Sequence, residues 1–218
     1  MDIAFVLYPN MTALDLVGPY DVLSPGPDVT AHLVAATPDP VLAGSAMRLV
    51  PTTTFDELDH ADVIVVPGGE PYDVLADGAV AAWLRKVHPT ATWTTSVCTG
   101  STLLASAGVL EGKRATTHWA LRDLLASLGA EVSTDRVVRD GSVLTAAGVS
   151  AGIDMALTLA GILWGDTVAQ GIQLAIEYDP EPPYDSGSVE KAAPEVVDFV
   201  RGVIASGFSA DKDEAATA

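Results

Sequence analysis

The only cysteine of the chain, Cys98, directly follows the apolar segment Thr92–Val97 and precedes Thr99, Gly100 and a run of small residues. This order predicts a strand, a sharp turn that carries the cysteine, and a helix. Such a turn lifts a side chain clear of the sheet at the carboxyl ends of the strands, where open α/β sheets bind ligands. The start of the following helix favours a thiolate, and backbone N–H groups beginning with that of Thr99 can hold a developing negative charge. We therefore interpret Cys98 as a nucleophile rather than as a small buried hydrophobic residue.

A second pair of backbone donors is predicted where Gly68 and Gly69 follow the apolar segment Asp62–Val66 and Pro67. Paired glycines at a strand end can direct their N–H groups into the same cleft as the cysteine. We predict that both glycines bind substrate and that the Gly69 N–H is a second donor to an oxyanion. The alternative is an ordinary tight turn.

An acidic partner for the thiol is predicted at Asp15, which lies between Leu14 and Leu16 just after the first apolar segment. A carboxyl group buried at this sheet edge would have a raised pKa and could donate a proton near neutral pH. The alternative is an aspartate in the first turn of a helix, stabilised there by the helix dipole.

The elements that must position these residues alternate between strand and helix. Apolar runs of strand length occur at 3–8, 29–36, 62–67 and 92–97, and helical patterns follow near 12–23, 72–87, 101–107, 119–128, 150–163 and 167–175. Continuous apolar strands alternating with helices are typical of an α/β fold with a mostly parallel central sheet covered on both faces. We also expect Thr12 to cap the first helix, a hairpin at 41–50, and Asp140-Gly141 to form a type I′ turn between strands 137–139 and 142–146.

No linker or repeat divides residues 1–178, which we predict to form one domain. Residues 179–218 differ from it, since they begin with three prolines and a Ser-Gly-Ser sequence and are acidic. We predict a C-terminal extension over 179–218 that contains a helix near 193–204, packs on the domain or on a dimer, and has a frayed end.

Composition excludes several classes of protein. The 218 residues carry a net charge of −18, and 49% of them are hydrophobic, so the chain can bury a core and is not disordered. One cysteine rules out a disulfide framework and a zinc site made of several thiolates. The acidic balance argues against nucleic-acid and membrane partners, and the N-terminus lacks the basic region of a secretory signal. We expect a cytoplasmic protein that acts on a small-molecule substrate.

Five short blocks of sequence, in this order along the chain, resemble the DJ-1/PfpI superfamily and, within it, the isonitrile hydratase branch and the sensor domains of AraC-type regulators. They are DLVGPYDVL (15–23), VPGG (66–69), VCTG (97–100), TTHW (116–119) and AGVSAGID (147–154). The resemblance covers about residues 1–178. It implies a flavodoxin-like three-layer sandwich, a homodimer, a reactive cysteine at the elbow, and Asp15 as its acidic partner. The regulators add a helix-turn-helix region, whereas residues 179–218 show no recognition-helix pattern, which favours a free-standing enzyme.

His118 is a candidate whose role stays open. Relatives with a Cys–His–acid triad would use it as a base and often place an acid directly after it, but Trp119 stands there, and Asp123 is five positions away. This departure argues against protease or amidase activity, and His118 is either a packed histidine near the cleft or a base. The other histidines have no ligand spacing, so we expect no metal site.

The resemblance implies a hydro-lyase that needs no cofactor and that adds water to an isonitrile, R–N≡C, to give an N-substituted formamide. Asp15 would donate a proton, Cys98 would attack the same carbon to form a thioimidate, and Thr99 would orient water or substrate. One alternative is glyoxalase-type conversion of 2-oxoaldehydes, which generally uses a histidine near the thiol. The other is a redox or ligand sensor in which Cys98 is oxidised rather than turned over.

Overall fold

The computed structural model describes residues 1–214 of the chain. The chain forms two compact units, Met1–Glu177 and Tyr178–Ala218. Within the second unit, the described part contains the helix α8 (Pro194–Glu214), which begins close to the predicted position and is longer than predicted. The packing expected for residues 179–218 stays a prediction. Part of the end that we predicted to be frayed, residues 215–218, lies outside the described residues.

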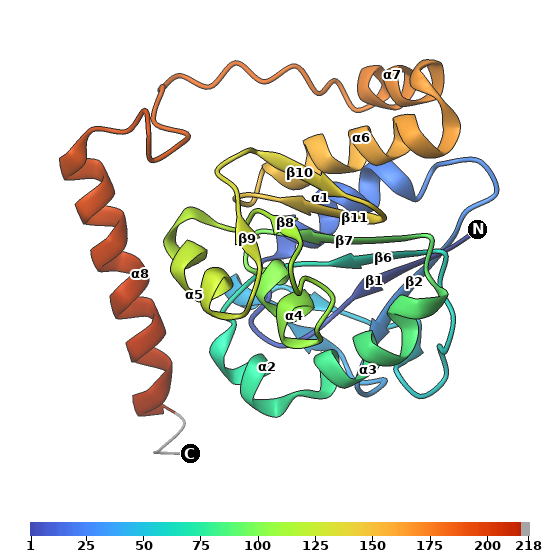
Figure 1. The fold of residues 1–218 in the computed structure, drawn as a ribbon, viewed down its shortest axis with the longest axis horizontal. Coiled ribbons are helices and arrows are strands. Elements are labelled where there is room, and N and C mark those ends of the chain that lie inside the picture. The colour runs from blue at the N-terminus through green and yellow to red at the C-terminus, as the bar shows by residue number, and fades with distance from the viewer. Residues whose placement is uncertain (215–218) are drawn as a thin grey trace. The chain divides into compact units, whose positions relative to one another are not determined.

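A seven-stranded sheet forms the centre of the first unit (Figure 1). Its order is β10-β11-β7-β6-β1-β2-β5, and every neighbouring pair is parallel except the edge pair β10–β11. The strands are β1 (Asp2–Val6), β2 (Thr30–Ala35), β5 (Thr53–Thr54), β6 (Val63–Val66), β7 (Trp93–Val97), β10 (Val137–Asp140) and β11 (Val143–Ala146). All residues of β6 and β7 are buried, as expected where helices cover both faces of a parallel sheet. The predicted mostly parallel sheet is confirmed.

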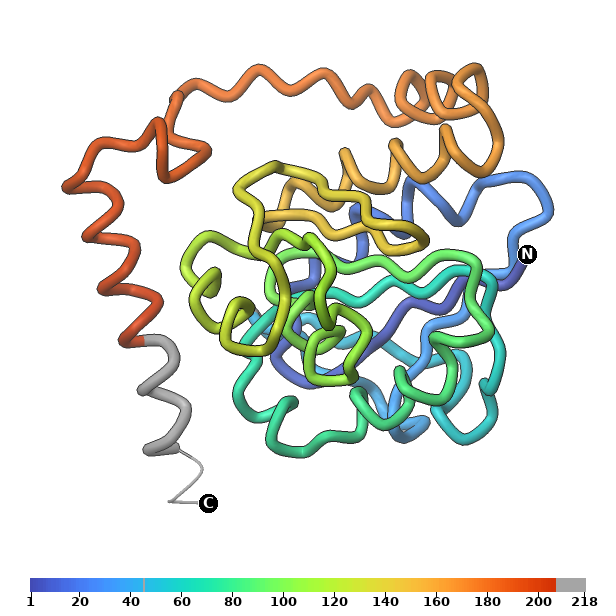
Figure 2. The backbone as a smooth tube through the Cα atoms, viewed as in Figure 1, coloured from blue at the N-terminus to red at the C-terminus, as the bar shows by residue number. Residues whose placement is uncertain are grey.

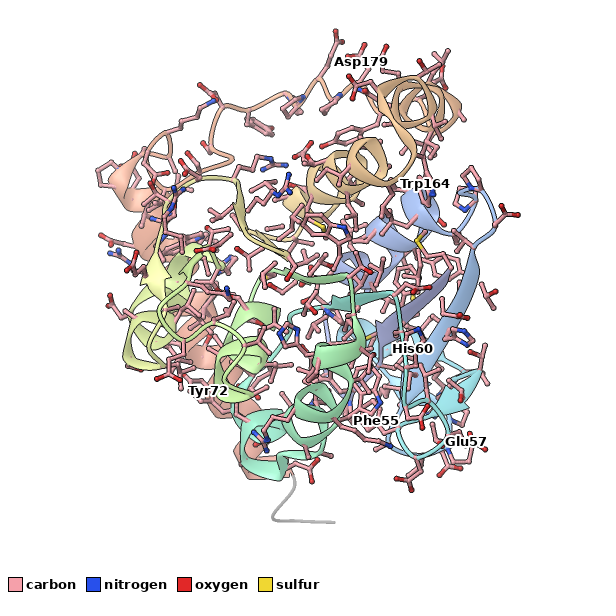
Figure 3. The ribbon with its side chains drawn as sticks, turned by 45° about the vertical axis from the view of Figure 1, so that its right-hand side comes forward. Phe55, Glu57, His60, Tyr72, Trp164 and Asp179 are labelled. Atoms are coloured by element: carbon pink, nitrogen blue, oxygen red, sulfur yellow. The ribbon has the colours of Figure 1, made fainter. Side chains whose placement is uncertain are left out.

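Helices cover both faces of this sheet and complete the predicted three-layer sandwich (Figure 1). One face carries α1 (Ala13–Leu23) and α6 (Ala151–Trp164), with α7 (Asp166–Ala175) packed on α6. The other face carries α3 (Ala79–Val87) and α4 (Gly100–Ser106), with α2 (Tyr72–Asp77) beside α3 and α5 (Arg122–Ser127) beside α4. Trp164, which is labelled in Figure 3, ends α6. Its ring packs against Gly26 in the turn after α1.

Short elements connect the layers. The hairpin of β3 (Val41–Leu42) and β4 (Arg48–Leu49) encloses a 3₁₀ turn, Gly44–Ala46, and β8 (Arg114–Ala115) pairs in parallel with β9 (Glu131–Val132). Two further 3₁₀ turns span His88–Thr90 and Trp119–Leu121. Among the residues described, no helix combines the length and the apolar character needed to cross a membrane.

Three local expectations are wrong. The helix predicted from 72 to 87 is divided at Gly78, whose φ of +75° ends α2 in the left-handed region. Thr12 lies at the N-cap of α1, but its side chain makes no capping hydrogen bond. The turn between β10 and β11 is not type I′, because Asp140 already pairs with Val143 and only Gly141 has a positive φ, whereas type I′ needs two such residues.

The first strand lies inside the sheet rather than at its edge, with β2 on one side and β6 on the other (Figure 2). The chain passes from β1 through α1 to β2, which β5 then extends, and β6, β7 and β11 are added on the opposite side of β1. Ligands bind in α/β sheets beyond the carboxyl ends of the strands at such a reversal of strand order. Here the segments after β1 and β6 meet, since the Thr12 N–H donates to the Gly68 carbonyl at 2.8 Å.

Candidate active site

Cys98 occupies the turn between β7 and α4 in a backbone conformation that is rare for a residue with a side chain. Its φ is +57°, in the left-handed region. Neighbouring elements fix this geometry. The Cys98 N–H donates to the Ala146 and Ala147 carbonyls at 3.1 and 2.8 Å, and the Thr117 hydroxyl donates to the Cys98 carbonyl at 3.0 Å. A strained backbone conformation that several neighbouring hydrogen bonds hold in place is found most often at functional sites, and it is expected for a nucleophile elbow.

Asp15, in the first turn of α1, is completely buried. Its Oδ2 accepts a hydrogen bond from the Gly68 N–H at 2.9 Å. Burial raises the pKa of Asp15 to about 7, although the Gly68 N–H and the neighbouring Cys98 thiol both lower it. The other carboxyl oxygen, Oδ1, is buried and has no hydrogen-bond partner among the described residues. The carboxyl is therefore a proton donor and acceptor poised at neutral pH beside the sulfur.

The Cys98 thiol, 5% exposed, keeps its proton. Burial raises its pKa, the negative charge of Asp15 raises it further, and the backbone N–H groups of Thr99 and Val149 lower it by less. The predicted effect of the helix start is thus present but outweighed, because desolvation penalises a thiolate. At pH 7 the pair is therefore half-way between two protons and one, and above pH 7 it holds a single proton.

Thr99 and the two glycines form the frame of this pair. The Thr99 hydroxyl accepts from the Gly69 N–H and donates to the Gly69 carbonyl, both at 2.8 Å. At Gly68 a Cβ would lie 2.5 Å from the Thr99 N and 2.8 Å from Asp15 Oδ2, so only glycine fits. We predicted that both N–H groups face the substrate, but each donates a hydrogen bond to a side chain of the site: Gly68 to Asp15 and Gly69 to Thr99. In this geometry Gly68 orients Asp15 and Gly69 orients Thr99.

His118 lies outside the Cys98–Asp15 pair. Its Nδ1 accepts from the Ala120 N–H at 3.4 Å and caps the short 3₁₀ turn that follows. Burial lowers the pKa of His118, and the positive charge of Arg122 lowers it further, so the ring is neutral. Among the described residues, no hydrogen bond connects it to Cys98. The arrangement matches a packed histidine near the site better than a base acting on the thiol.

Two residues of the site were not among the predicted ones. Tyr8, buried just beyond β1, donates its hydroxyl to the Pro67 carbonyl at 2.9 Å. Burial and the negative charges of Asp15, Cys98 and Glu70 raise its pKa well above the usual value. Its position at the end of the first apolar run could have indicated it. Val149 contributes only a backbone N–H, and no residue type signals that in a sequence.

Acidic, histidine and cysteine side chains do not gather elsewhere into a metal site: within the described part of the chain, no group of three or more is placed to hold an ion. The arrangement that remains is a buried thiol, a carboxyl that titrates near neutrality, and a hydroxyl fixed beside them. These groups can deliver a proton and a nucleophile to one small molecule.

Comparison with known proteins shows which chains this one is similar to. The family model of the DJ-1/PfpI family matches residues 1–161. The chain is 50% identical to an isonitrile hydratase of Pseudomonas putida over 202 residues, which are 92% of this chain and 89% of that protein. It is 31% identical over 184 residues to the HTH-type transcriptional regulator CdhR of Pseudomonas aeruginosa, covering 81% of this chain but only 53% of the regulator.

A solved structure has the same architecture. The crystal structure of a ThiJ/PfpI family protein from Pseudomonas syringae superposes with a TM-score of 0.91 at 37% identity, covering 95% of this chain and 87% of that one. The match extends over nearly the whole length of both proteins, so the likeness is not limited to the central sheet.

Proposed function

Because this chain belongs to the DJ-1/PfpI family, we propose that it hydrates isonitriles to N-substituted formamides, with Cys98 as nucleophile and Asp15 as proton donor and acceptor. The 50% identity to an isonitrile hydratase along most of both chains supports the reaction. The observation that carries the proposed mechanism is the buried carboxyl of Asp15, whose pKa is raised to about 7 beside the Cys98 thiol.

This pair suits the chemistry of the isonitrile carbon. That carbon is a weak base and becomes an electrophile once it is protonated, so a proton and a nucleophile must reach the same atom. A pair that holds a single mobile proton supplies both. The proton moves to the carbon, the sulfur forms the C–S bond, and the product is a thioimidate, R–N=CH–S–Cys98, with Asp15 left ionised.

Water completes the reaction. Asp15 accepts one proton of the water as its oxygen bonds to the thioimidate carbon, and the nitrogen receives the other. The C–S bond then breaks, its electron pair returns to the sulfur, and R–NH–CHO leaves. The pair regains its single proton, so atoms and charge balance over one cycle.

Thr99 and the glycines hold the reacting groups in place. We assign to the Thr99 N–H the stabilisation of negative charge on the sulfur when the C–S bond breaks, since it already lies against the thiol. The Thr99 hydroxyl, held by Gly69, orients the attacking water. An oxyanion role for the Gly69 N–H would require this hydroxyl to turn away, so we assign Gly69 to positioning.

The two alternatives have less support from this geometry. A glyoxalase-type reaction generally uses a histidine near the thiol, and His118 instead caps a 3₁₀ turn. A redox sensor needs an accessible thiolate, whereas the Cys98 thiol is buried and its pKa is raised.

The test is an assay in which NMR measures the formamide produced from a simple alkyl isonitrile. Cys98→Ala is expected to reduce turnover to the uncatalysed rate, and Asp15→Asn to lower kcat by about 10²–10⁴-fold. Asp123→Asn, which changes an exposed acid on α5, is the control that should keep full activity. Formamide production by Cys98→Ala, or turnover of methylglyoxal but not of isonitriles by the unmodified protein, would contradict the proposal.

A further inference from the structure

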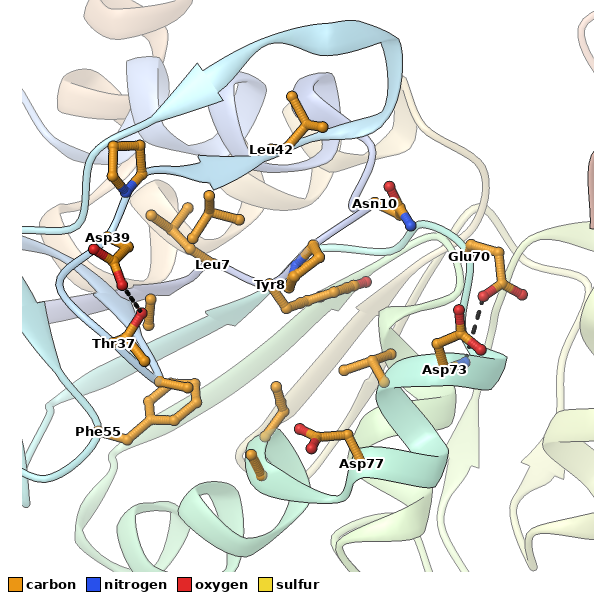
Figure 4. A pocket seen from close by; sticks show the side chains of 18 residues that line it. Leu7, Tyr8, Asn10, Thr37, Asp39, Leu42, Phe55, Glu70, Asp73 and Asp77 are labelled. Atoms are coloured by element: carbon orange, nitrogen blue, oxygen red, sulfur yellow. Dashed lines mark hydrogen bonds between the residues drawn. The ribbon is translucent and has the colours of Figure 1, made fainter. Parts of the chain in front are cut away.

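A cavity of about 580 Å³ lies next to the candidate active site and is not part of it (Figure 4). Its lining includes Tyr8 but neither Cys98 nor Asp15. Tyr8 also belongs to the candidate active site, since its pKa is raised by the negative charges of both residues. The volume falls within the range of small-molecule sites.

The floor of the cavity is apolar. It is built by the segment after β1, the end of β2, the β3–β4 hairpin and the first residues of α3. Most of the large side chains involved are buried: Leu7, Tyr8, Val41, Phe55, Val74 and Val80. Such a floor binds the hydrocarbon part of a ligand and disfavours a bare hydrated ion.

The rim of the cavity is negatively charged. Asp39, Glu70, Asp73 and Asp77 line it, and none of the described lining residues is a lysine, arginine or histidine. The chain as a whole carries −18, so its overall field also favours a cation.

Asp77 distinguishes this rim from an ordinary solvated surface. Glu70 accepts from the Tyr72 and Asp73 N–H groups at the start of α2, and Asp73 lies in its first turn, so both stabilise that helix. Asp77 is the last residue of α2, where the helix dipole disfavours a negative charge. Its carboxylate extends into the cavity (Figure 4).

We propose that this cavity binds an organic ammonium ion with an apolar body, the hydrocarbon on the floor and the ammonium group at the carboxylate rim. The rings of Tyr8 and Phe55 add faces that attract a cation. A divalent metal does not suit this rim, because no three acidic side chains in the described part of the chain are placed to coordinate one. This site is separate from the proposed isonitrile hydration, because its lining contains neither Cys98 nor Asp15 and an isonitrile carries no net charge.

The first test uses the full chain and 2-phenylethylammonium as the probe, with binding measured by calorimetry. The neutral 2-phenylethanol has a similar body and reports the apolar contribution alone. We expect the ammonium ion to bind about tenfold more tightly than the alcohol, from a few partly exposed ion pairs, and this advantage to shrink in high salt. Equal affinities, or no binding of the ammonium ion, would overturn the proposal.

The second test locates the site with variants. Asp77→Asn should weaken ammonium binding about two- to fivefold, and Asp73→Asn combined with Asp77→Asn about tenfold. Because the dipole disfavours Asp77, its single replacement should leave Tm unchanged or raise it. Asp123→Asn is the matched control, since Asp123 and Asp73 are exposed aspartates in the first turns of two six-residue helices. An equal loss in Asp123→Asn would mean non-specific attraction and would contradict a site here.

A third variant separates this cavity from the active site. Cys98→Ala should bind 2-phenylethylammonium as the unmodified protein does, even when it has lost formamide production. If ammonium binding disappears with Cys98→Ala, the ion occupies the active site and the proposal is wrong. Loss of isonitrile turnover alone leaves the ammonium site supported, so the two hypotheses fail independently.

Discussion

At the scale of single residues, burial decides the protonation state of the candidate site. Asp15 has no exposed surface and Cys98 almost none, so each charged form is penalised, and the pair loses its first proton near pH 7 rather than near pH 4. The helix start at α4 acts on the same sulfur with the opposite sign and is the weaker effect. The two groups titrate as one coupled unit, and activity should follow the unit rather than either residue.

The pH dependence of turnover follows from this coupling. Below pH 7 the pair holds two protons, and after transfer of one to the substrate Asp15 would still be protonated and unable to accept a proton from water. We expect kcat/KM for an isonitrile to rise about tenfold per pH unit below pH 7 and to level off above it. A rate profile measured from pH 5 to 9 checks this. A rate that falls as the pH rises through 7 would contradict the proposed single-proton pair.

Stability should show the cost of ionising Asp15. Its pKa is raised on folding from 3.8 to about 7, so the folded state binds the extra proton and stability falls as the pH rises between these values. The loss is up to about 4 kcal/mol, and Asp15→Asn, which cannot ionise, should escape it. Urea unfolding at pH 4 and pH 8 measures the difference. If both proteins change equally with pH, Asp15 is not the titrating group.

Tyr8 should support Asp15 without touching the substrate. Its hydroxyl holds the Pro67 carbonyl, and the next residue, Gly68, orients the carboxyl. Tyr8→Phe keeps the ring and removes this bond, so we expect a loss of about 1 kcal/mol in stability and a roughly tenfold decrease in kcat. A structural role alone would lower stability and leave the pH profile of kcat unchanged, whereas a positioning role should also shift it.

At the scale of elements, long apolar runs were predictable and short turns were not. The strands β1, β6 and β7 appear within two residues of their predicted ends, because continuous buried residues fix a parallel strand whatever surrounds it. Asp15 could be expected near the cysteine for the same reason, since the carboxyl ends of neighbouring parallel strands meet at one edge. The use of the Gly69 N–H by Thr99 depends on a residue 30 positions along the chain, whereas the break at Gly78 and the turn at Gly141 depend on the positive φ of single glycines.

The turn after β6 is the element most sensitive to a single added carbon. Gly68→Ala would place its Cβ 2.5 Å from the Thr99 N and 2.8 Å from Asp15 Oδ2. Because a backbone atom cannot move aside cheaply, we expect a loss of about 1–3 kcal/mol in stability and at least a hundredfold decrease in kcat. Gly171→Ala on α7 is the control, since nothing lies within 4 Å of its Cβ and alanine favours a helix. Equal effects of the two replacements in thermal unfolding and in the formamide assay would contradict the steric argument.

At the scale of the whole molecule, an apolar hollow is the surface at which we expect a second copy to bind. α1 buries Asp15 on one side, and on the other it exposes Leu14, 47% accessible, beside Met47 of the β3–β4 hairpin, also 47% accessible. Thr12, Ala13, Val17 and Gly44 also line the hollow. Exposed apolar surface of this kind on one face is typical of an interface, and it is consistent with the homodimer that the family resemblance implies.

The homodimer can be tested by placing a charge in this hollow. The protein should elute with twice its chain mass of 22.5 kDa in light scattering, and Leu14→Glu should shift it towards the single-chain mass at micromolar concentrations, because an unpaired charge buried in an interface costs several kcal/mol. Leu174→Glu on α7 is the matched control, since Leu174 is 78% exposed and lies outside the hollow. A single-chain mass for the unmodified protein, or dissociation caused equally by Leu174→Glu, would reject this interface. Since α1 also carries Asp15, a dissociated Leu14→Glu protein that keeps full activity would show that the catalytic pair is complete within one chain.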